Sequence, residues 1–173
     1  VLNGQYDVVK YLISKGANPD AADSSGNHAM HYACAYGWLS IVKLLHEAGA
    51  SLTSANDWKK TPLSVAFLKG FTEVCDYLLA YPGVDVNLVD ENGQTMLHNI
   101  LDSKNADTFK LARFLVKDKK AKVDIVDSEG NTVFHILCAS THADDLNIAE
   151  MLLEHGADLD TANKEGVRPL DKA

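Results

Sequence analysis

The amino-acid sequence predicts an all-α fold, a solenoid of stacked helix–turn–helix units joined by β-turns or hairpins. Three observations support this prediction. A segment recurs four times along the chain, with lengths of 33, 34, 37 and 36 residues. Apolar residues in the second half of each copy follow the spacing of one helical face. All 11 glycines fall at turn or helix-end positions of the repeat.

Length and composition favour a folded, acidic chain. The 173 residues are 46% hydrophobic, and 16 Lys and Arg against 24 Asp and Glu give a net charge of −8. An acidic balance argues against binding to nucleic acid, which depends on basic residues that neutralise phosphates. No apolar run approaches the ~20 residues of a membrane span, so no membrane insertion is expected. Three cysteines without a C-x-x-C motif fit reduced thiols in an intracellular, cytoplasmic or nuclear protein.

The repeat covers the whole chain, and we expect one continuous array over residues 1–173. The array opens with the second half of a unit and closes with the first half of another, so we expect further repeats or domains to flank it in a longer parent protein. The complete copies are residues 23–55, 56–89, 90–126 and 127–162, and the partial copies are residues 1–22 and 163–173.

Each complete copy begins with a turn that leads into a short first helix. Asp or Asn recurs at the residue that opens the turn, where its side chain can accept local backbone N–H groups. Thr61, Thr95 and Thr132 can cap the helix, and Pro62 falls in the first turn, where a missing N–H is harmless. The first helices should begin near Ala29, Pro62, Met96 and Val133, each followed by a second, antiparallel helix.

The second helices share an apolar stripe that predicts one buried face. Helices this short are marginal alone, so each unit needs its neighbours to cover that face. The stripe reads Val8-Val9-x-Tyr11-Leu12-Ile13, Ile41-Val42-x-Leu44-Leu45, Val74-Cys75-x-Tyr77-Leu78-Leu79, Leu111-Ala112-x-Phe114-Leu115-Val116 and Ile148-Ala149-x-Met151-Leu152-Leu153.

These features resemble the ankyrin repeat, a unit of roughly 33 residues with a β-turn, two helices and a T-P-L-H-x-A signature. In this chain the signature reads HAMHYA, TPLSVA, TMLHNI, TVFHIL and RPLDKA. The resemblance extends over the whole chain. It implies that His31, His98 and His135, which share the His position of the signature, hydrogen-bond between neighbouring units.

The copies at residues 90–126 and 127–162 each have three more residues between their two helices than the other complete copies. These additional residues lie within Asp102–Asp107 and Ser140–Asp145. Neutral drift in tolerant surface loops and a partner-specific feature are both open interpretations. One further residue follows the second helix in two copies, and in one of them it falls in the basic stretch 117–122, which we expect to be a solvated helix end.

The sequence contains no motif that indicates catalysis. It lacks an H-E-x-x-H metal site, zinc-finger spacing, a calcium loop, a nucleophile elbow and a glycine-rich phosphate loop. The pair His28 and His31 is a weak metal signal that we interpret as structural. We therefore predict a chain with no enzyme activity, cofactor or metal site of its own.

The resemblance instead implies a protein-binding scaffold with a concave surface made by hairpin tips and first helices. Trp58, Tyr36 and Leu68 would form an apolar anchor, and acidic later units suggest a partner with basic residues beside a hydrophobic one. Trp58 could instead only staple two neighbouring hairpins together. The resemblance assigns the surface to Trp58, Tyr36, Leu68, Ser25, Asn27, Asp57, Lys60, Lys69, Asn92, Gln94 and Glu129.

Two further expectations follow from the resemblance. A monomeric array could serve as the substrate-targeting or regulatory arm of a larger enzyme, such as an ADP-ribosyltransferase or a kinase. Asn87, with Leu79, Asp85 and Val86, resembles the pattern around the asparagine that an oxygen-dependent asparaginyl hydroxylase modifies in many ankyrin repeats. Asn87 could equally serve only to fix the base of its hairpin.

Overall fold

The computed structural model describes residues 3–103, 107–140 and 145–172. Parts of both predicted inter-helix insertions, residues 104–106 and 141–144, lie outside this range. Among the described residues, the regular secondary structure is helical and no strand forms. One isolated β-bridge pairs Ala22 with His28. The chain forms two compact units, Val1–Asp85 and Val86–Ala173, which we call unit 1 and unit 2.

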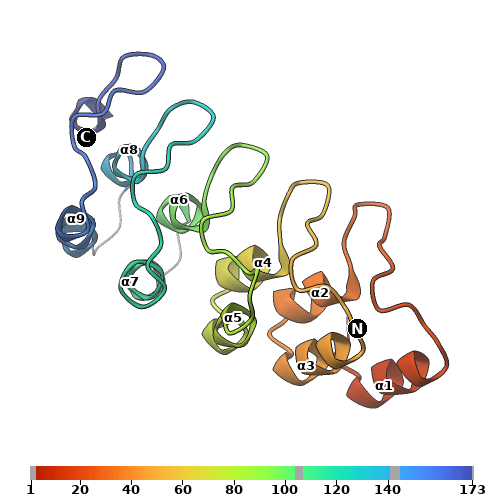
Figure 1. The fold of residues 1–173 in the computed structure, drawn as a ribbon. Helices are drawn as coiled ribbons and strands as arrows, with labels where there is room; N and C mark the ends of the chain where they lie inside the picture. The colour runs from red at the N-terminus through yellow and green to blue at the C-terminus, as the bar shows by residue number, and fades with distance from the viewer. Residues whose placement is uncertain (1–2, 104–106, 141–144, 173) are drawn as a thin grey trace. The chain divides into compact units, whose positions relative to one another are not determined.

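The described residues of unit 1 form the helices α1 to α5, which pack in two layers (Figure 1). The first helices α2 and α4 pack on each other, and each also packs on the second helix of its own repeat, α3 or α5. Helix α1 packs on α3, which in turn packs on α5. The bounds are α1 (Tyr6–Ser14), α2 (Ala29–Ala35), α3 (Leu39–Glu47), α4 (Pro62–Leu68) and α5 (Thr72–Leu79).

Unit 2 repeats this arrangement among its described residues. Helix α8 lies between α6 and η2 in one layer, and α7 packs on α9 in the other (Figure 1). The bounds are α6 (Met96–Asp102), α7 (Thr108–Arg113), the π-helix η1 (Phe114–Asp118), α8 (Val133–Cys138), α9 (Asp145–Glu154) and the 3₁₀-helix η2 (Pro169–Lys172).

The predicted starts of the first helices are confirmed, because α2, α4, α6 and α8 begin at Ala29, Pro62, Met96 and Val133. Thr61 caps α4 by accepting the N–H of Ser64. The stripe of the second helices is buried in part: Ile41, Leu45, Leu78 and their equivalents in the complete repeats are almost fully buried. The prediction is wrong for Leu153, which is 45% exposed, and for Val8, Tyr11 and Leu12 of α1, which are also exposed. These short elements are therefore held by the layers around them.

The second helix of the third repeat differs from the sequence prediction. The sequence predicts an additional residue after this helix, but α7 ends at Arg113 and the chain continues as the π-helix η1. Lys119 closes the wider turn by donating its N–H to the carbonyl of Phe114 at 3.1 Å. The insertion is thus absorbed inside the helix, which keeps Leu115 and Val116 buried.

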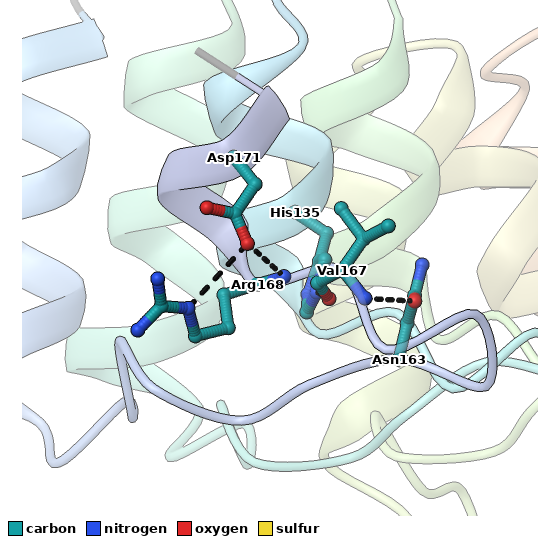
Figure 2. Close-up of polar contacts among 5 residues, drawn as sticks. All are labelled: His135, Asn163, Val167, Arg168 and Asp171. Carbon is teal, nitrogen blue, oxygen red and sulfur yellow. Dashed lines mark hydrogen bonds and ion pairs between the residues drawn. The ribbon is translucent and has the colours of Figure 1, made fainter.

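A turn closed by an Asp or Asn side chain opens each complete repeat and the last partial one, as predicted. In the first, Oδ1 of Asp23 accepts the N–H groups of Ser25 and Asn27, both at 2.9 Å. Figure 2 shows the equivalent bond from Val167 to Asn163. The same pair of bonds forms at Asn56, Asp90, Asp127 and Asn163.

Three buried histidines connect one repeat to the next within each unit. Nδ1 of His31 accepts the N–H of His28 at 3.1 Å, so the ring proton must lie on Nε2, which donates to the carbonyl of Lys60 at 3.0 Å. His98 and His135 make the same pair of bonds, with the carbonyls of Asn131 and Val167 at 3.3 and 2.9 Å.

Two repeats carry another residue at this histidine position. Ser64 donates its hydroxyl to the carbonyl of Thr61 at 2.8 Å, within its own turn. Oδ2 of Asp171 accepts the backbone N–H of Arg168 at 2.9 Å and forms an ion pair with Nε of the Arg168 side chain at 3.4 Å (Figure 2). Asp171 thus accepts the N–H that a histidine accepts elsewhere, whereas Ser64 does not. Neither side chain has the Nε2–H group with which the histidines bridge repeats.

We expect the stability of the chain to fall in mild acid because the bridge requires neutral imidazoles. Burial lowers the pKa of His31 and His98 below the ordinary 6.5. A group whose pKa is lower in the folded state than in the unfolded state stabilises the fold fully at any pH above its unfolded-state pKa. This stabilisation is lost as the pH falls through the folded-state pKa. Urea unfolding from about pH 7.5 to pH 5 should therefore show a decline that starts near 6.5.

The double variant H31Q/H98Q is the control for this decline. Glutamine has no titrating group, so the variant should be less stable at neutral pH and should lose less stability on acidification. An equal decline in both proteins would contradict the assignment of this pH dependence to the two bridging imidazoles.

Candidate protein-binding surface

Trp58 lies at the tip of a hairpin in unit 1. Its backbone N–H donates to Oδ1 of Asn56 at 3.1 Å, which fixes the turn, while its side chain is 44% exposed. No ring stack onto Trp58 is present in the described part of the chain. A large aromatic side chain at such a position can insert into a partner.

The residue after Trp58 has a strained backbone. Lys59 has φ 56°, in the left-handed region, where the other four turns have a glycine. A side chain in this conformation costs roughly 1–2 kcal/mol relative to a helical or extended one. The turn therefore keeps a lysine beside Trp58 at a cost to stability.

Tyr36 contacts an aromatic residue that sequence reasoning did not select. Tyr36 is 50% exposed and stacks on Trp38, with ring centroids 4.8 Å apart and planes 14° apart. Trp38 covers Gly4, where a Cβ atom would lie 2.9 Å from the indole, and Phe71 covers Gly37 in the same way. An aromatic directly after the inter-helix glycine was the sequence signal for this packing.

Several predicted surface residues of unit 1 take part in contacts between hairpins. Oδ1 of Asn27 accepts a hydrogen bond from Nδ2 of Asn56 at 2.9 Å, and the N–H of Asp57 donates to the carbonyl of Ser25 at 3.2 Å. Lys60 is half-buried and its carbonyl accepts the bond from His31. The amide of Asn27 is thus engaged within the fold.

The remaining two predicted residues of unit 1 lie at the end of α4. Leu68, the last residue of this helix, is half-buried, and Lys69, its C-cap, is exposed. The rim of the surface in unit 1 therefore includes Lys59, Lys60 and Lys69. Asp57 precedes Trp58 and Lys59 follows it, and both are exposed, so the charges beside Trp58 are mixed. The sequence suggested acidic surroundings for the later repeats.

The predicted residues of unit 2 lie on two adjacent hairpins. The carbonyl of Asn92 accepts the N–H of Ser128 at 2.9 Å, which joins the two tips. Gln94 is half-buried, whereas Asn92 and Glu129 are exposed. Glu129 also accepts Nδ2 of Asn131 at 3.2 Å.

Asn87 stands at the base of its hairpin and is half-buried. Its Oδ1 accepts the N–H of Lys122, 35 residues further along the chain, at 2.8 Å. Asp20 occupies the same frame position and accepts the N–H of Ser51 at 2.9 Å. Asn87 therefore connects two repeats through its oxygen atom.

The described residues offer no arrangement that indicates catalysis or metal binding. They contain no group of three His, Cys, Asp or Glu side chains that could hold an ion. Cys34 is fully buried, and burial raises the pKa of its thiol, which disfavours the nucleophilic thiolate. The helices of the described part of the chain are too short or too polar to cross a membrane.

Comparison with known proteins identifies the repeats. A family model for ankyrin repeats in three copies matches residues 1–90 and 79–163. The poly [ADP-ribose] polymerase tankyrase of Caenorhabditis elegans is 49% identical over 84 residues, which are 46% of this chain and 4% of that protein. Cyclin-dependent kinase 4 inhibitor B of Rattus norvegicus is 31% identical over 84 residues, 48% of this chain and 65% of that protein.

Solved structures show the same fold. An ankyrin repeat domain from Acinetobacter baumannii matches with a TM-score of 0.84 and 23% identity, over 99% of this chain and 86% of that one. The ankyrin repeat domain of Bcl-3 matches with a TM-score of 0.81 and 25% identity, over 98% of this chain and 73% of that one.

Replacing the strained lysine should stabilise the protein. We expect Lys59→Gly to raise the free energy of unfolding by about 0.5–1 kcal/mol, because glycine removes the left-handed strain but adds freedom to the unfolded chain. Urea denaturation measures the change. Lys60→Gly is the matched control, since Lys60 lacks a positive φ and should only lose stability. Equal destabilisation of both variants would show that the turn is not strained.

Proposed function

The chain belongs to the ankyrin repeat family, and we propose that it is a non-catalytic scaffold that binds a protein or peptide partner through its hairpins and first helices. The observation that carries the proposal is the 44% exposed Trp58 on a hairpin tip whose next residue is strained. Strained turns and exposed aromatic residues are both enriched at binding sites.

Relatives support a binding role. One relative is an inhibitor of a cyclin-dependent kinase, and Bcl-3 is a member of the IκB protein family. Ankyrin repeats are protein-interaction modules. We further infer a monomer that works inside the cell, where its three cysteines stay reduced.

The side chains suggest the chemistry of the partner. In unit 1, Trp58, Tyr36 and Leu68 offer apolar surface for a hydrophobic side chain of the partner. In unit 2, acidic groups such as Glu91 and Glu129 are exposed and would favour Lys or Arg. We propose a partner segment with a hydrophobic anchor residue and basic residues nearby.

A second candidate function is a targeting or regulatory arm within a larger enzyme. The observation that favours it is the 49% identity to a poly [ADP-ribose] polymerase, of which this chain spans 4% of the length. The sequence of the parent protein around these repeats distinguishes the two functions: a catalytic domain in the same polypeptide would support the second.

Trp58→Ala should weaken partner binding by about 2 kcal/mol or more and leave the melting temperature nearly unchanged. Calorimetric titration with a peptide selected by display against the intact chain measures the affinity, and differential scanning calorimetry measures Tm. Trp38→Ala is the contrasting variant, because Trp38 packs on Gly4 and its loss should lower Tm. A lower Tm for Trp58→Ala without loss of affinity would mean that Trp58 only staples hairpins together.

We also propose Asn87 as a substrate of an asparaginyl hydroxylase. Tandem mass spectrometry after incubation with such an enzyme should find one added oxygen atom on Asn87. Asn87→Asp should remain unmodified and folded, since Asp20 makes the same bond at its own position. Modification at the exposed Asn92 instead, or at neither residue, would leave Asn87 with only its structural role.

A further inference from the structure

A cleft lies between two second helices of unit 2. The helix α7 and its continuation η1 form one side and α9 forms the other, and α7 and α9 pack on each other in one layer (Figure 1). We call it the α7–α9 cleft. Its volume is about 220 Å³. Sites for drug-sized ligands measure roughly 300–1,000 Å³, so this cleft suits a smaller molecule.

The two sides of the cleft carry opposite charges. Arg113 and Lys117 lie about one helical turn apart on the first side, and Glu150 and Glu154 lie one turn apart on α9. Nζ of Lys117 and Oε2 of Glu154 form an ion pair at 3.5 Å. In the described part of the chain, the side chains of Arg113 and Glu150 make no hydrogen bond or ion pair. A guanidinium and a carboxylate therefore line the same space with their bonding capacity unused.

Phe109 and Met151 supply the apolar part of the lining. Met151 is almost fully buried and Phe109 is half-buried, so the fold holds both side chains in place. An aliphatic group of a ligand can pack on such a ring and thioether. The cleft thus combines a few charged groups with an apolar surface, as small-molecule sites commonly do.

The equivalent place in unit 1 is filled by an aromatic ring. Lys43 and Tyr77 occupy the frame positions of Arg113 and Met151, and Nζ of Lys43 lies 5.5 Å from the centroid of the Tyr77 ring. Such a position favours a cation–π interaction. Met151 offers the cation of Arg113 no such ring, which leaves the space between the two helices of unit 2 open.

The backbone on one side of the cleft is irregular. Lys117 belongs to the π-helix η1, which forms part of this side. Single π-turns inside α-helices are rare and occur frequently at functional sites. The π-helix is an observation independent of the charges, and it indicates the same place in unit 2.

The opposite charges select the class of ligand. A simple anion would be attracted by Arg113 and repelled by Glu150, and a simple cation would experience the reverse. A molecule with both a carboxylate and an ammonium group satisfies both side chains, since arginine binds a carboxylate through two parallel hydrogen bonds and glutamate accepts from ammonium. Residues inside a protein chain carry neither of these backbone charges, so a peptide segment does not supply the pair.

We propose that the α7–α9 cleft binds a small zwitterion with an apolar group, of the class of the free aliphatic α-amino acids. Its carboxylate pairs with Arg113, its ammonium group pairs with Glu150, and its side chain packs on Met151 and Phe109. The site is independent of the proposed scaffold function, because its residues lie on α7, η1 and α9 and none lies on a hairpin or a first helix.

The test titrates L-leucine into the full chain. NMR follows the methyl group of Met151 and the backbone amides of α7 and α9. These signals should shift with half-saturation near about 1 mM, within the range that ligands of this size reach. Leucinamide lacks the carboxylate and N-acetylleucine lacks the ammonium charge, so each should bind about tenfold more weakly or worse.

Charge variants of the protein test the same two contacts. Arg113→Gln and Glu150→Gln should each weaken L-leucine binding about tenfold, because each removes one charged hydrogen-bonding partner. Lys110→Gln, exposed on α7 outside the cleft, and Glu165→Gln, exposed on the last hairpin, are the matched controls and should keep full affinity.

Met151→Tyr places the tyrosine of unit 1 in the cleft. It should fill the space and abolish the amide shifts, with an unchanged circular-dichroism spectrum. The proposal is overturned if L-leucine gives no saturable shift at Met151, or if both glutamine variants of the cleft keep full affinity. Equal binding of N-acetylleucinamide, which carries neither charge, would also overturn it. Partner binding through Trp58 is measured separately, so each of these outcomes leaves the scaffold proposal standing.

Discussion

The hydrogen bond from a buried imidazole to a carbonyl of the next repeat is the constraint on which each unit depends. His31, His98 and His135 must each keep Nδ1 as an acceptor for the helix cap and Nε2 as a donor to the neighbour. One neutral ring thus satisfies two backbone groups that burial would otherwise leave unpaired. Because the ring is both cap and bridge, the start of a helix and the spacing of repeats are determined together.

The turns provide the second half of this construction. Each Asp or Asn side chain closes its own hairpin, and the tips then approach closely: a Cβ atom on Gly93 would lie 2.8 Å from the backbone nitrogen of Ser128. With the backbone engaged in this way, an exposed side chain such as that of Trp58 is free to vary, although Asn27 and Asn56 also join two hairpins through their side chains. Lys59 shows the limit of that freedom, since it occupies a left-handed position that glycine fills elsewhere.

The sequence predicted what depends on local backbone chemistry. The starts of α4, α6 and α8 follow from Thr and Pro, and that of α2 from its place in the repeat, while the histidine bridges are what the resemblance implies for one position of the signature. It did not predict what depends on neighbours. The π-helix η1 forms because burial of Leu115 and Val116 outweighs regular hydrogen bonding. The Tyr36–Trp38 stack and the exposure of Leu88, Val89 and Val126 likewise require knowledge of which surfaces remain uncovered.

Binding specificity in such a chain can change without change in the fold. The bonds that join repeats use backbone groups, imidazoles and turn carboxylates or amides, and residues 58, 88, 89 and 126 contribute no side chain to them. Trp58 in unit 1, and Leu88, Val89 and Val126 in unit 2, therefore occupy exposed positions where a substitution alters the surface and leaves the core intact.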